Sequence, residues 1–61
     1  MNPIPLGTFI MPLGKVGAVG MTNGERYYWM VGHDGAVTMT PAMVVEPMYL
    51  EQYASPQGEK P

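Results

Sequence analysis

The chain has 61 residues, a net charge of −2 and no cysteine, so it has room for one small domain and excludes disulfide bonds and thiolate metal sites. Its three basic residues are too few for the clustered Lys and Arg of a phosphate-binding surface, which argues against nucleic acid as a partner. Below roughly 70–80 residues, a single core seldom supplies more than about 3–5 kcal/mol of folding free energy. This favours a chain that binds another protein or a second copy of itself.

Residues 1–7 are expected to form an N-terminal arm. Pro3 and Pro5 fix φ and push the residues before them toward extended geometry, so we expect the arm to be loosely held. Prolines also interrupt the apolar runs here and no basic start precedes them, so we expect neither a signal peptide nor a membrane partner. The default location is then the cytoplasm, of the organism's own cell or of a host cell. A short apolar strand is predicted over residues 8–11 and ends at Pro12, which cannot donate to a sheet ladder.

Residues 14–46 carry most of the structural information. Glycine occurs at every third position from Gly14 through Gly17 to Gly20. Without accompanying prolines this spacing is not collagen-like, and it indicates a strongly bent strand with Val16 and Val19 facing inward. Bending of this kind is how small barrels turn their corners.

The Asn23-Gly24 pair is the clearest local signal in the chain. Both residues tolerate positive φ, so the pair predicts a tight hairpin turn into a strand over residues 26–31. This second strand has the highest β propensity in the chain.

Both faces of that second strand are apolar. Alternation places Tyr27, Trp29 and Val31 on one face. Tyr28 and Met30 then lie on the opposite face. The strand is therefore predicted to be central in the sheet, or to offer half of its surface to a partner.

The remaining elements are shorter. A glycine-bracketed turn over residues 32–35 leads to a returning strand over residues 36–39. A sharp bend is expected over residues 40–43, followed by a last short strand at Val44-Val45. Pro47 can begin a short helix through Tyr53, which would place Tyr49 and Tyr53 on one side. Residues 55–61 contain too few apolar side chains to pack against the domain and are expected to be disordered.

These patterns resemble the SH3-like group of small β-barrels. The Gly-x-Val-Gly-x-Val run over residues 14–19 is similar to the opening of KOW-type barrels. The Tyr28-Trp29 pair, the glycine turn and the proline-led bend before Val44 resemble the end of signalling SH3 domains, with Met43 where that family has a tyrosine. The resemblance implies an all-β fold, a small barrel of about five short antiparallel strands over residues 8–54 with a 3₁₀ or short helical turn near the C-terminus. It also implies a groove in which Trp29 and Pro41 occupy matching places.

Chemistry-bearing residues are sparse. His33-Asp34 is the one adjacent acid–base pair, and turn formation between two glycines accounts for both residues. A metal site needs three or four ligands, and one histidine with scattered acids does not supply them. We therefore expect no enzyme activity, no cofactor and no metal.

Methionine is over-represented, with seven in the chain. Methionine is common at adaptable binding surfaces, although it also fills gaps in small cores. Because the valines compete for core space, several of the larger apolar side chains are expected to form an exposed patch, drawn from Met21, Tyr28, Met30, Met43, Met48 and Tyr49. The residues predicted to bind a partner are Tyr27, Tyr28, Trp29, Met30, Met43 and Tyr49.

The sequence thus predicts a non-catalytic protein–protein interaction module. By association with other very short chains, one such role is a viral or mobile-element regulator that inhibits or redirects a host protein. The alternative is a small structural or assembly subunit that forms homo-oligomers. A third hypothesis is single-stranded nucleic-acid binding through stacked aromatics, against which the charge argues.

Overall fold

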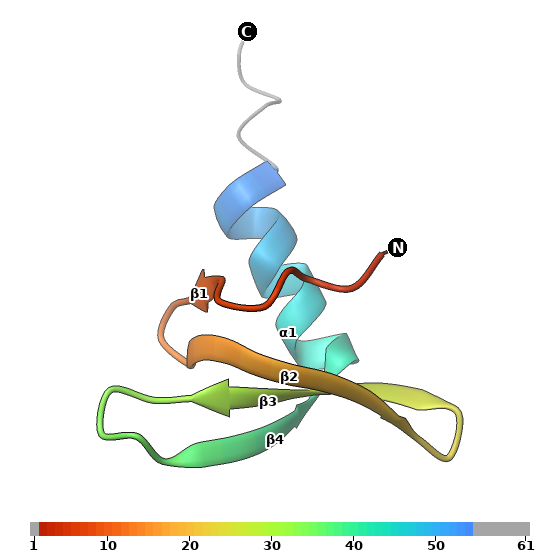
Figure 1. Ribbon diagram of the computed structural model, residues 1–61. Coiled ribbons are helices and arrows are strands. Elements are labelled where there is room, and N and C mark those ends of the chain that lie inside the picture. The colour runs from red at the N-terminus through yellow and green to blue at the C-terminus, as the bar shows by residue number, and fades with distance from the viewer. Residues whose placement is uncertain (1, 55–61) are drawn as a thin grey trace, which may run out of the picture.

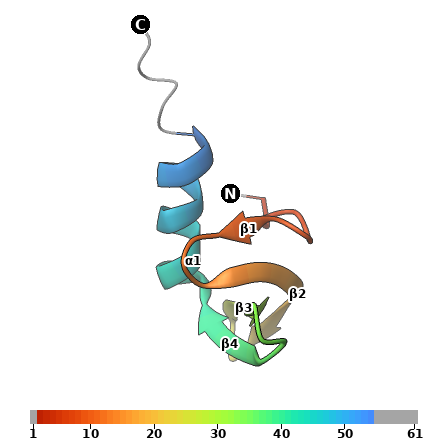
Figure 2. The same ribbon diagram turned by 90° about the vertical axis from the view of Figure 1, so that its left-hand side faces the viewer.

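The computed structural model describes residues 2–54. One antiparallel sheet holds four strands in the order β1-β2-β3-β4, and it curls into a half-barrel (Figure 1). The strands are β1 (Phe9–Ile10), β2 (Gly14–Thr22), β3 (Glu25–Val31) and β4 (Val37–Pro41). Helix α1 (Ala42–Tyr49) follows, and a π-helical segment η1 (Leu50–Ala54) continues it. Figure 2 shows α1 rising from the end of β4 and passing beside β1.

The predicted hairpin between β2 and β3 is confirmed. Asn23 and Gly24 both have positive φ, 53° and 78°, and Thr22 faces Glu25 across the turn. The register then shifts between Val16 and Ala18, which makes Gly17 the extra residue of a β-bulge. The predicted bend in this strand is therefore present.

Gly14 permits the close approach of β2 to the end of β3. Its φ is 120°, a conformation that residues with a Cβ rarely adopt, and a Cβ at this position would collide with the carbonyl oxygen of Val31. Glycine at the start of β2 thus lets the strands pack at this corner.

The core lies between the sheet and α1. As predicted, Val16 faces inward and is 1% exposed, whereas Val19 shares that face and remains 36% exposed. Three partly buried side chains, Leu13, Met48 and Tyr49, pack against the buried core residues. The buried core residues are Ile4, Ile10, Val16, Tyr28, Met30, Ala42 and Val45.

The N-terminal arm is part of the fold, and the expectation that it is loosely held is wrong. Ile4 is 1% exposed and belongs to the core. The amide of Gly7 donates to the carbonyl of Val16 at 2.8 Å, and the amide of Val16 donates to the carbonyl of Thr8 at 2.9 Å. One apolar side chain and these backbone bonds hold the arm against the sheet.

The described residues form four strands, helix α1 and the segment η1, so the expected fifth strand at Val44-Val45 is wrong. The helix begins at Ala42, directly after Pro41, and turns Ala42 and Val45 together onto the core because residues three apart share a helix face. Pro47 lies inside this helix rather than at its start. It removes only the bond to the carbonyl of Met43, a residue that is 80% exposed.

The C-terminal prediction holds in part. Tyr49 and Tyr53 lie on one side as expected, with ring centroids 5.3 Å apart. The segment predicted to be disordered, 55–61, lies outside the described residues. No helix within residues 2–54 is long and apolar enough to cross a bilayer.

Candidate functional site

The sheet has one covered face and one uncovered face. Figures 1 and 2 show α1 and the N-terminal arm on the same side of the sheet, and no described element covers the other side. Residues opposite each other on paired strands share a face, so the register assigns each side chain to one side. We call the uncovered side the outer face, and its main side chains are Ala18, Tyr27, Trp29, Val31, Val37 and Met39.

Trp29 is the centre of the outer face. It lies opposite Ala18 on β2 and opposite Met39 on β4. Gly20 leaves room for the indole, because a Cβ there would lie 3.1 Å from two ring carbons of Trp29. The bulge at Gly17 matters here, since it resets the alternation of β2 and places Ala18 and Gly20 on the outer face, opposite Trp29 and Tyr27.

The outer face is apolar at its centre and charged at its ends. On β4, Val37 is 59% exposed and Met39 is 50% exposed. Lys15 lies at one end, opposite Val31. At the other end Glu25 accepts a hydrogen bond from the Tyr27 hydroxyl at 3.5 Å. An apolar centre with a polar rim is the usual anatomy of a protein–protein interface.

No family model matches the chain, and neither a curated protein nor a solved structure matches it.

The predicted site residues do not form one surface. Tyr27 and Trp29 lie on the outer face. Tyr28 and Met30 are 0% and 1% exposed, so the expectation that they are exposed is wrong, because α1 covers their side of the sheet. Met43 is 80% exposed but lies on α1.

The rest of the expected patch is also divided. Tyr49 and Met48 pack partly against the core, and Met21 is 65% exposed on β2. Sequence reasoning missed Val37 and Met39 as surface residues beside Trp29. The sequence feature that could have identified them is the alternation of the returning strand, which places Val37 and Met39 on the same face.

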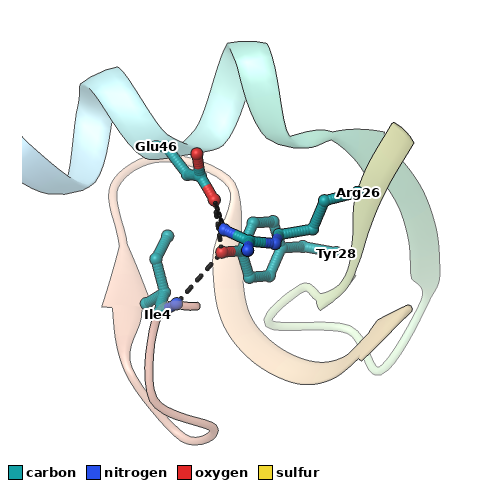
Figure 3. A network of polar contacts seen from close by, with 4 residues as sticks. All are labelled: Ile4, Arg26, Tyr28 and Glu46. Atoms are coloured by element: carbon teal, nitrogen blue, oxygen red, sulfur yellow. Dashed lines mark hydrogen bonds and ion pairs between the residues drawn. The ribbon is translucent and has the colours of Figure 1, made fainter. Parts of the chain in front are cut away.

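Tyr28 carries a polar network on the covered side (Figure 3). Its hydroxyl donates to a carboxylate oxygen of Glu46 at 2.7 Å and accepts the backbone amide of Ile4 at 3.0 Å. Arg26 donates to the same Glu46 oxygen at 2.6 Å. The network therefore links the arm, through Ile4, to Tyr28 of β3 and to Glu46 of α1.

The network shifts the pKa values of Tyr28, Glu46 and Arg26. Burial raises the pKa of Tyr28, and its bond to Glu46 raises it further, so the phenol remains a donor. Burial acts to raise the pKa of Glu46, but the hydrogen bonds from Tyr28 and Arg26 outweigh it and hold that pKa below its ordinary value. The bond to Glu46 raises the pKa of Arg26, which stays cationic.

The depressed pKa of Glu46 predicts a loss of stability in acid. A carboxylate whose pKa is lower in the folded state stabilises the fold above its unfolded pKa, about 4.3, and loses that contribution as the pH falls through the folded value. We therefore expect the melting temperature to fall as the pH is lowered below about 4.3. Glu46→Gln should be less stable at neutral pH and should lose part of this acid dependence. Glu25→Gln, at an exposed residue, should keep the wild-type profile, and an identical acid dependence in all three proteins would contradict the assignment.

Asp34 has a structural role in the turn after β3. Asp34 accepts the amide of Ala36 at 3.0 Å, which closes the turn after β3 as the turn reading of His33-Asp34 predicts. Within residues 2–54 no group of three His, Asp or Glu side chains is placed to hold a metal. A hollow of about 240 Å³ lies where the start of β3 meets the start of α1, between Arg26 and Met43.

Proposed function

We propose that the protein is a non-catalytic interaction module: an SH3-like half-barrel that binds another protein through its outer face. Its inner face, the arm and α1 are used to build the core, which leaves the outer face as the free apolar surface of the sheet. A regulator that inhibits or redirects the protein it binds is one role that such a module would serve.

The observation that carries the proposal is the position of Trp29. The ring lies at the middle of the outer face, between Ala18 and the half-exposed Met39. Tryptophan and tyrosine dominate the energetics of protein interfaces, most strongly near the centre of the contact. An exposed apolar patch with a polar rim has the anatomy of a protein–protein interface, whereas small-molecule sites are concave. The occupant is therefore a protein surface whose apolar side chains pack against the half-buried indole and the exposed Met39 beside it.

The proposal is tested by capture with paired variants. Wild-type protein, Trp29→Ala and Met43→Ala are each used as bait in lysate from cells in which the protein is found. We expect a dominant partner to be lost with Trp29→Ala and retained with Met43→Ala, because Met43 is exposed on α1. A partner retained equally by all three baits would contradict the proposal.

A second variant separates loss of binding from loss of fold. Ala18→Lys adds a charge at an exposed outer-face position opposite Trp29 without removing the ring. It should keep the wild-type circular dichroism spectrum and lose the same partner. If Ala18→Lys binds as well as the wild type, the outer face is not the interface.

A further inference from the structure

The second edge of β4 is open. Among the described strands, β4 pairs only with β3, and its other edge faces solvent (Figure 1). Val37, Thr38 and Met39 are all exposed. The strand carries no charged residue and no bulge, two of the devices that protect an edge from pairing, and its one proline, Pro41, stands at its last position.

The hairpin fixes which backbone groups point toward this edge. In a two-residue turn the flanking residues, Thr22 and Glu25, form a hydrogen-bonded pair. Bonded and non-bonded pairs alternate along an antiparallel ladder, so residues 25, 27 and 29 direct their amides toward β2. Residues 26, 28 and 30 then direct theirs toward β4. The amide of Gly32, which donates to the carbonyl of Ala36 at 2.9 Å, continues the same alternation.

This alternation directs the backbone amides and carbonyls of two β4 residues toward the open edge. Thr38 and Thr40 lie opposite Met30 and Tyr28, so they form the bonded pairs with β3. Val37 and Met39 lie at non-bonded positions, and their amides and carbonyls point to the open edge. Pro41, which has no amide proton, also falls at a non-bonded position, in agreement with this assignment.

We propose that a second copy of the chain pairs with this edge, antiparallel and about a two-fold axis at Thr38. Val37 of each copy then lies opposite Met39 of the other and exchanges both backbone hydrogen bonds with it. Thr38 lies opposite Thr38 of the second copy at a non-bonded position, with Cα atoms about 4.5 Å apart. The two four-stranded sheets become one continuous sheet.

The edge is complementary to itself rather than to a charged or irregular strand. Val37 and Met39 are both apolar and share the outer face, so pairing each with the other continues the apolar row across the axis. No like charges meet, because the edge has none. Pro41 ends the pairing at one side and the turn before Val37 ends it at the other, so the register centred on Thr38 is favoured.

The contact is small, so the dimer is expected to depend on concentration. A standard interface buries about 800 Å² on each partner, and a pair of five-residue strands provides less than that. The inference does not rest on the proposed binding of another protein. It would place two outer faces side by side, which would double the surface offered to a partner.

Substitution of Thr38 by a positive or a negative residue tests this arrangement. The wild type, studied alone by sedimentation equilibrium, should shift from monomer toward dimer as its concentration rises. Thr38→Lys and Thr38→Glu should each weaken association at least tenfold, because two like charges face each other across the axis. An equimolar mixture of the two variants should restore association. Ala18→Lys carries its charge on β2, away from this edge, and should associate like the wild type.

Several results would overturn the inference. A wild type that remains monomeric at the highest attainable concentration would do so. So would a dimer that is unaffected by either Thr38 variant, or one that the mixture of variants does not restore. Amide exchange at Val37 and Met39 should slow as the concentration rises. Slowing only in the presence of a different protein would assign the edge to a foreign strand and contradict self-pairing. Thr38→Lys should still bind a partner of the outer face, so the two proposals fail separately.

Discussion

Replacing Tyr28 with phenylalanine is expected to lower the free energy of unfolding by about 2–4 kcal/mol. The ring remains in the core, but the amide of Ile4 loses its buried acceptor and Glu46 loses a donor. An unsatisfied buried donor costs about 1–3 kcal/mol, and a hydrogen bond to a charged group contributes about 1.5–3 kcal/mol. Since a core of this size supplies only about 3–5 kcal/mol, the variant should be largely unfolded at moderate temperature.

Urea unfolding followed by circular dichroism measures this loss. Tyr27→Phe is the matched control on the neighbouring residue, because the Tyr27 hydroxyl makes only a 3.5 Å contact with Glu25 at the surface. That control should lie within about 0.5 kcal/mol of the wild type, as surface substitutions do. Equal stability of the two phenylalanine variants would show that the network at Tyr28 does not hold the fold together.

Ile4→Ala is expected to destabilise the protein by about 2–5 kcal/mol, the range for a buried isoleucine truncated to alanine. Such a loss is larger than a loosely held arm would give. Ile4 is 1% exposed and in the same core cluster as Val45 of α1. Its loss should leave a cavity between the arm and the helix.

Leu6→Ala is the control for the arm. Leu6 is 63% exposed, so its truncation should change the midpoint of urea unfolding very little. If Ile4→Ala and Leu6→Ala have the same midpoint, the arm is not an integral part of the core.

The hairpin was predictable because its signals are local. Asn23 and Gly24 accept positive φ, and no distant contact competes with that preference. The alternation of β3 was also readable, so Tyr27 and Trp29 were correctly separated from Tyr28 and Met30. Which of the two faces is buried was not readable, because both are apolar and the choice depends on where α1 packs.

The errors arose where tertiary packing overrode local preference. Val44-Val45 has strand propensity, yet a helix brings Ala42 and Val45 onto the core together, and that burial outweighs the propensity of two residues. The arm was misjudged for a similar reason. Prolines indicate extended backbone before them, but they do not reveal that Ile4 between them enters the core.

The most direct test of the account is the affinity of the captured partner, once purified, for the wild type, Trp29→Ala and Met43→Ala. With Trp29 at the centre of the interface, its truncation should cost about 2 kcal/mol or more, a roughly 30-fold rise in Kd, while Met43→Ala should bind as tightly as the wild type. A Trp29→Ala protein that is folded, by its circular dichroism, and binds with unchanged Kd would contradict the account.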